Sequence, residues 1–182
     1  MRTVLGIDPG ARATGLCVLS GDEIIAHRTI TSEGEIFPAE RRYVLAVLEA
    51  GATLLQIHDI DLVAVETITR PSWHMKGRAA VDPTALLATA EVLGAVLGVD
   101  WPVNVTQIRP NKNGSQPLGT YPGVLVSPAE RRKAGWEARI GGGQLRHARS
   151  AYDVASIATK LAGTSHSQRR THEHQPPHSN QG

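Results

Sequence analysis

The 182-residue sequence has little of several things that often define a protein class. Its one cysteine, Cys17, excludes an internal disulfide and fits a reducing compartment. Aromatic residues make up 4% of the chain, so the core is expected to consist of Val, Leu, Ile and Ala. No apolar run is as long as a membrane span, and Met1 leads directly into a strand-like segment, not into a signal peptide. We therefore expect a soluble cytoplasmic protein.

A strong excess of charge of one sign is also lacking. The chain has 19 Lys and Arg against 17 Asp and Glu, a formal charge of +2, which by itself proves no nucleic-acid partner. Helix-turn-helix, zinc-finger and RNP motifs are absent, which argues against readout of base sequence. Hydrophobic residues are plentiful at 41%, enough for one core of ordinary size.

The order of the predicted elements is that of a mixed α/β sheet. Strands are predicted at 3–8, 14–20, 23–30, 61–68 and 103–108, and helices after Pro38 and at 83–97, 128–139 and 148–162. Tight turns favour antiparallel pairing of the first three strands, and helical connections favour parallel pairing of the others. We expect a five-stranded sheet with helices on both faces over residues 1–162, followed by a disordered, polar, His-rich tail at 163–182.

Three acids lie in these apolar elements. Asp8 ends the first strand, Glu66 ends the apolar run that begins at 61, and Asp153 lies in the last helix. The two strands can be neighbours in the sheet, which would bring Asp8 beside Glu66 with Asp153 laid across them. Carboxylates packed together repel one another unless a cation is bound, and Mg²⁺ or Mn²⁺ prefers such oxygen ligands. We expect a site with two divalent ions that hydrolyses phosphodiesters.

Each acid also has an ordinary structural explanation. Asp8 stands in Asp-Pro-Gly, which suits a turn cap. Glu66 could pair with Arg70 on the surface, and Asp153 could pair with Arg149 one helical turn earlier. On the residues taken singly, these alternatives stay open.

Three segments together resemble the RuvC Holliday junction resolvases, which have an RNase H-like fold. They are GIDPGARATG at 6–15, LVAVET at 62–67 and SAYDVASIA at 150–158. The resemblance covers about residues 3–162 and implies a homodimeric, metal-dependent endonuclease acting on four-way DNA junctions. It also implies that Asp8, Glu66 and Asp153 are metal ligands. The tail and the long loop at 109–126 are more like the phage or mobile-element branch of the family.

Two departures from the family pattern affect the expected site. The family has an acid or a histidine one turn before the last aspartate, where this chain has Ser150. His147 is the expected substitute; placed in the loop before the helix, it would ligate metal or transfer a proton. The family also has an aromatic wedge just after the second acid, where this chain has Thr69. Trp73 is the candidate replacement, and burial in the core or in a dimer contact is its alternative.

Cations are expected to border the acids and to bind DNA phosphates. The candidates are Arg12, Arg70, Lys76, Arg78, Lys112 and Arg146, and Arg131, Arg132 and Lys133 could extend the path. Any one of them could equally be an ordinary surface cation. The Ala/Gly/Leu stripe of the helix at 83–97 is a candidate dimer surface, with packing on the sheet as its alternative.

Three other functions stay open. An actin-like or sugar-kinase-like ATPase would need a second lobe, for which 182 residues leave no room. A related nuclease could cut flaps or RNA–DNA hybrids instead of junctions. A junction-binding protein with weak or lost activity is the third alternative, and the three intact acids argue against it.

Overall fold

A five-stranded mixed sheet forms the centre of the fold. The computed structural model describes residues 2–69 and 83–172, with side chains as far as residue 163. The strands are β1 (Thr3–Asp8), β2 (Ala13–Ser20), β3 (Glu23–Thr31), β4 (Leu62–Glu66) and β5 (Asn104–Ile108). Their order is β3-β2-β1-β4-β5. The pairs among β1, β2 and β3 are antiparallel, and β4 pairs in parallel with both β1 and β5, as the turn and helix pattern predicted.

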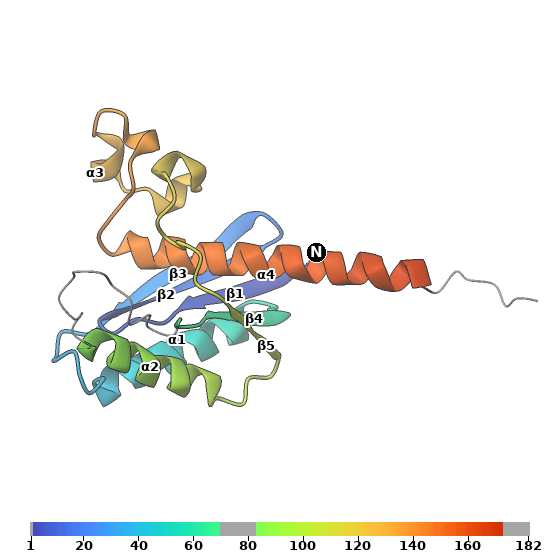
Figure 1. Ribbon diagram of the computed structural model, residues 1–182, viewed down its shortest axis with the longest axis horizontal. Coiled ribbons are helices and arrows are strands. Elements are labelled where there is room, and N and C mark those ends of the chain that lie inside the picture. Colours follow the sequence, from blue (N-terminus) through green and yellow to red (C-terminus); the bar gives the residue numbers. More distant parts are fainter. Residues whose placement is uncertain (1, 70–82, 173–182) are drawn as a thin grey trace, which may run out of the picture.

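Helices cover both faces of the sheet, which confirms the predicted fold class (Figure 1). Helices α1 (Arg41–Ile57) and α2 (Thr84–Leu97) lie on one face and α4 (Leu145–His172) on the other. Leu5 and Ile7 of β1 enter the core under α1 and α2, whereas Val4 enters the core under α4. Alternate side chains of a strand point to opposite faces, so the nearly continuous apolar runs of β1 and β4 fill both cores. No helix in the described part of the chain combines the length and hydrophobicity needed to span a membrane.

The stripe of α2 is divided between core and surface. Val92, Leu93 and Val96 are buried on the side of α2 that faces the sheet. This is expected if the stripe packs on the sheet instead of on a second copy. Leu87, by contrast, is 46% exposed, and Gly94 has open space around its Cα. The exposed part of the stripe remains the candidate for contact with a second copy.

The last helix is longer at both ends than predicted. It begins at Leu145 rather than at 148, and it continues to His172, past the expected start of a disordered tail at 163. The apolar periodicity begins only at Ala148, which made the predicted start too late. At the other end the helix extends into polar residues, because adding residues to a helix that has already formed is much easier than starting one. The rest of the predicted tail, 173–182, lies outside the described residues.

A small arm, residues 115–142, stands on α4 on the side away from the sheet (Figure 1). It contains the 3-10 turns η1 (Leu118–Thr120), η2 (Gly123–Leu125) and η3 (Trp136–Ala138) and one short helix, α3 (Pro128–Arg131). The single helix predicted at 128–139 is therefore broken, because Gly135 adopts a left-handed conformation between α3 and η3. The arm has its own small apolar cluster, which packs against Ala148 of α4.

Candidate active site

Asp8 lies at the end of β1, where a buried hydrogen-bond network fixes the following turn. The backbone N–H of Gly10 donates to Thr14 Oγ1 at 3.3 Å, and the Tyr43 hydroxyl donates to the Gly10 carbonyl at 2.7 Å. Since that donation uses the only proton on Tyr43, Thr14 Oγ1 donates to Tyr43 Oη at 2.7 Å. Burial raises the pKa of Tyr43 to about 12, so the hydroxyl keeps its proton. The turn is thus tied to α1 without using the Asp8 side chain.

Glu66 lies beside Asp8 because of the strand register. Ile7 pairs with Val65 across the parallel β1–β4 ladder, so the next residues, Asp8 and Glu66, reach the same edge of the sheet. Burial, together with a hydrogen bond to Asp8 and repulsion from it, raises the pKa of Glu66 to about 8. The raised pKa favours a protonated Glu66 beside Asp8. This confirms that the two acids predicted from the strand pattern come together.

Two neutral donors hold the Glu66 carboxylate in place. Ser150 Oγ donates to Glu66 Oε2 at 3.0 Å, and Asn113 Nδ2 donates to Oε1 at 2.9 Å. Both donors are buried, Ser150 in α4 and Asn113 in the loop after β5. Each Glu66 oxygen therefore has a fixed partner on a different element, which limits the rotation of the carboxylate.

His147 contacts Asp8 from α4. Its Nδ1 lies 3.1 Å from Asp8 Oδ2, and the two side chains are 26% and 15% exposed. Because α4 begins at Leu145, His147 is inside the helix, not in the preceding loop as predicted. Residues three apart on a helix, such as His147 and Ser150, are separated by only about 60° around its axis. One face of the first turns of α4 therefore supplies a contact to each carboxylate.

Two glycines let α4 lie directly on the backbone of the sheet. A Cβ at Gly15 would overlap the carbonyl of His147, and one at Gly6 would overlap the carbonyl of Ala151. These contacts are with helix backbone, which cannot rotate away as a side chain can. A side chain at Gly6 or Gly15 would push α4 outward, and with it His147.

Asp153 has hydrogen-bond partners in the loop after β5 and in the arm. Its Oδ2 accepts hydrogen bonds from the Gly114 N–H and from the Tyr121 hydroxyl, both at 2.8 Å. Burial raises the pKa of Asp153, and these two bonds together with the charge of Lys160 oppose that shift. The hydrogen-bond partners of Asp153 thus belong to the loop after β5 and to the arm, whereas the partner of Ser150 is Glu66.

The predicted convergence of three acids stays a prediction in its third member, because the hydrogen bonds that the structure shows for Asp153 lie with Gly114 and Tyr121. Within residues 2–69 and 83–163, no three His, Cys, Asp or Glu side chains are grouped so that they could hold a metal ion. Asp153 lies about 120° around the axis of α4 from His147 and about 60° from Ser150. Its hydrogen bonds lie in the 113–121 segment, which also supplies Asn113 to Glu66. Arg149, the alternative partner of Asp153, pairs with Glu130 of the arm at 3.2 Å.

The predicted DNA-binding cations divide into two groups. Arg12, Lys112 and Arg146 are exposed; the first two lie in loops and Arg146 in the first turn of α4. Arg12 donates to the Gly34 carbonyl at 3.2 Å, Lys112 precedes Asn113, and Arg146 precedes His147. The other cations, Arg70, Lys76 and Arg78, lie outside the described residues, and so does Trp73, the candidate wedge.

No protein-family model matches the sequence, and no curated protein matches it. Among solved structures, Thermus thermophilus RuvC in complex with a Holliday junction substrate aligns with 84% of this chain and 90% of its own, at 19% identity and a TM-score of 0.50. The chain has the RNase H-like fold of RuvC.

Two further structures align less well. A second Thermus thermophilus RuvC structure covers 88% of this chain and 96% of its own, at 20% identity and a TM-score of 0.47. YeaZ from Pseudomonas aeruginosa covers 72% of this chain and 48% of its own, at 16% identity and a TM-score of 0.32. The likeness to RuvC concerns the fold, so the roles of individual side chains must be argued from their own geometry.

Sequence reasoning missed three residues of this site. Asn113 and Ser150 hold Glu66, and Tyr121 holds Asp153. Ser150 had a signal, because it replaces the acid or histidine expected from the resemblance to RuvC. Asn113 and Tyr121 lie in a loop with no periodic pattern, and no local feature of the sequence assigns them a partner on another element.

Proposed function

We propose that the protein is a metal-dependent endonuclease that cuts branched DNA, with the four-way junction as its main substrate. The observation that carries the proposal is the Asp8–Glu66 pair, two carboxyl groups that the parallel strand register places at adjacent strand ends. Such a pair reduces the stability of the fold, because a buried hydrophobic residue at either position would avoid the repulsion. The RNase H-like fold shared with RuvC supports the assignment, and the junction named for that structure suggests the substrate.

The donors present suit one hard divalent cation. Mg²⁺ is commonly bound through one or two carboxylates together with water and substrate phosphate, so two acids are sufficient. Asp8 and Glu66 would hold the ion, which would take the place of the proton on Glu66 and polarise the scissile phosphate. Mn²⁺ suits the same oxygens. The second ion expected from the sequence relied on Asp153, whose carboxylate is engaged by Gly114 and Tyr121, so we propose one ion at the pair.

His147 is proposed to accept the proton of the attacking water. With a proton on Nδ1 donated to Asp8 Oδ2 at 3.1 Å, Nε2 carries the free lone pair. Nε2 takes a proton as the water oxygen bonds to phosphorus, and the bond from phosphorus to the 3′ oxygen breaks. Solvent then protonates the leaving oxygen. Asp8 thus orients the imidazole, and Ser150 and Asn113 keep Glu66 in position.

Exposed cations on both sides of the pair would guide the DNA backbone. Lys112 precedes Asn113, which binds Glu66, and Arg146 precedes His147, which contacts Asp8. Without these cations, the acids would repel the phosphates. The symmetry of a four-way junction favours a homodimer, and we propose the exposed part of α2 around Leu87 and Gly94 as its contact surface.

A cleavage panel tests this function. The wild-type chain is incubated with a four-way junction, a flap, a linear duplex and an RNA–DNA hybrid, with Mg²⁺ or with a chelator. We expect Mg²⁺-dependent cutting of the junction, with paired nicks on two opposed strands if the protein acts as a dimer. Faster cutting of the flap or of the hybrid would show that this DNA, and not the junction, is the main substrate. Binding of the junction without cutting in Mg²⁺ and in Mn²⁺ would show a binding protein and contradict the proposal.

A further inference from the structure

A buried guanidinium holds the arm on α4, in addition to the Tyr121–Asp153 hydrogen bond and the apolar cluster around Ala148. Arg149 has no exposed surface, and its Nη1 donates to the Leu125 carbonyl at 2.9 Å. Its Nη2 donates to the Gly142 carbonyl at 3.0 Å and to Glu130 Oε1 at 3.2 Å. These contacts reach the middle and the end of the arm. Because removing one partner of a buried ion pair leaves an uncompensated charge, this arrangement holds the arm in one position on the helix.

The short helix α3 is held by the same acid. Ser127 and Glu130 form a capping box, in which Ser127 Oγ accepts from the Glu130 N–H at 3.2 Å and Glu130 Oε2 accepts from the Ser127 N–H at 2.9 Å. Glu130 therefore caps α3 and binds Arg149 at the same time. Its negative charge is neutralised inside the arm and does not reach the outer surface.

The outer surface of the arm is positively charged. Residues 128–139 contain four cations and two acids, and one of the acids is the neutralised Glu130. The cations are Arg131, Arg132, Lys133 and Arg139, all exposed. Arg132 and Lys133 have no ion-pair partner in the described part of the chain, so their charges face solvent.

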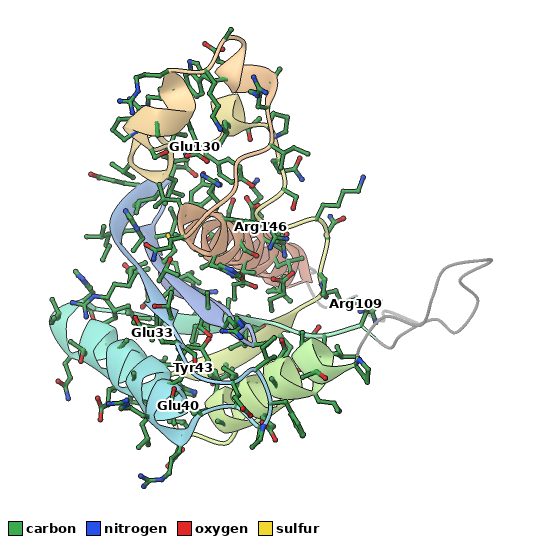
Figure 2. All side chains as sticks on the ribbon, turned by 90° about the vertical axis from the view of Figure 1, so that its left-hand side faces the viewer. Glu33, Glu40, Tyr43, Arg109, Glu130 and Arg146 are labelled. Carbon is green, nitrogen blue, oxygen red and sulfur yellow. The ribbon has the colours of Figure 1, made fainter. Side chains whose placement is uncertain are left out.

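This positive surface continues toward the proposed active site. The arm stands on the first turns of α4, the part that carries His147 and Ser150 (Figure 1). Figure 2 shows Glu130 inside the arm and Arg146 on α4 below it. Arg146 is exposed, and the next residue, His147, contacts Asp8. A polyanion bound at the Asp8–Glu66 pair would therefore find cations in the direction of the arm.

The arm suits a duplex better than a single strand. Proteins that hold single strands stack bases on exposed aromatic rings. The two aromatic residues of the arm are Tyr121, which is buried, and Trp136, which packs against the arm's own apolar cluster. The outer surface thus offers charge without a stacking platform, which favours contact with the phosphates of a double helix.

We propose that the arm binds the phosphate backbone of one duplex of the branched substrate, while the Asp8–Glu66 pair holds the strand that is cut. This inference rests on the proposed nuclease function and adds to it a second DNA contact, at a distance set by Arg149. It explains why a surface segment without catalytic side chains is fixed to α4 by a buried ion pair. The arm thereby determines how a duplex lies relative to the cutting site.

The test is a salt titration of DNA binding with the Arg132→Glu/Lys133→Glu variant of the full chain. Each phosphate contact contributes about 0.9 to the slope of log affinity against log salt concentration. Loss of two contacts is expected to reduce that slope by about 2 and to weaken junction binding roughly tenfold or more at moderate salt. An Arg132→Gln/Lys133→Gln variant tests the same contacts without adding negative charge.

The matched control is Arg41→Glu/Arg42→Glu, an adjacent pair of exposed cations at the start of α1, on the opposite face of the sheet. We expect its slope to remain close to that of the wild type. Equal losses in both double variants would show a general effect of net charge, and an unchanged slope in the arm variants would show no contact; either result overturns the arm proposal and leaves the nuclease intact. If the wild-type chain neither binds nor cuts DNA, the proposed function fails and the arm proposal fails with it.

Discussion

Replacing Asp8 with asparagine is expected to abolish cleavage of a four-way junction while leaving binding equal or slightly tighter. Asparagine keeps the size of the side chain and its contact with His147 but removes the charge that would hold the cation. The stabilisation that a bound ion gives a phosphoryl transition state is several kcal/mol, so the single-turnover rate should fall by about 10³-fold or more. Binding is preserved because a negative charge near the DNA phosphates is lost. Gel-shift and single-turnover assays on one junction measure both quantities.

The control for this prediction is Asp59→Asn. Asp59 is exposed and lies just before β4, at the end of the strand opposite to Glu66. Its substitution should leave both rate and affinity unchanged. Cleavage by Asp8→Asn at a rate within tenfold of the wild type would remove Asp8 from the active site.

Replacing His147 with alanine is expected to slow cleavage by about 10² to 10⁴, the usual contribution of a positioned proton acceptor. The variant His147→Asn separates the two roles of the ring. The asparagine amide can still donate to Asp8 from nearly the position of Nδ1, but it has no basic nitrogen in place of Nε2. Both variants should therefore lose a similar factor in rate at saturating Mg²⁺, and the measurement is the single-turnover rate as a function of pH.

His58→Ala serves as the control, because His58 lies at the C-terminal end of α1, outside the contacts of the Asp8–Glu66 pair. A wild-type rate for His147→Asn combined with a slow His147→Ala would show that the ring acts only by holding Asp8. Wild-type rates for both variants would make His147 a bystander.

The sheet and the acidic pair could be predicted because they depend on local patterns. Apolar runs and tight turns predicted the five strands, and the helical connections predicted the parallel pairs. The parallel register of β1 and β4 then brings Asp8 beside Glu66. Strand register is a strong constraint, since a slip by one residue would turn every side chain to the other face. The position of a strand-end acid thus follows from the pattern of its strand.

The helix face could not be predicted with the same accuracy. The start of α4 differs by three residues from the predicted start, which moves His147 from a loop into the helix. Each residue turns a helix by about 100°, so the choice of the face that meets the sheet decides which side chains reach Glu66. That face is fixed by contacts of the helix backbone with Gly6 and Gly15, which no periodicity in α4 reveals. The resemblance to RuvC favoured Asp153 as a ligand, whereas its hydrogen bonds lie with Gly114 and Tyr121.

The measurement that tests the account most directly is the single-turnover cleavage rate of Asp153→Asn in Mg²⁺, compared with that of Asp8→Asn on the same junction. The asparagine oxygen can still accept from the Gly114 N–H and the Tyr121 hydroxyl, so the loop that carries Asn113 should stay in place. We predict a rate within about tenfold of the wild type, against a loss of about 10³-fold or more for Asp8→Asn. An equal collapse of both rates, in variants that remain folded, would show that Asp153 holds a catalytic ion and would contradict a centre built on Asp8 and Glu66.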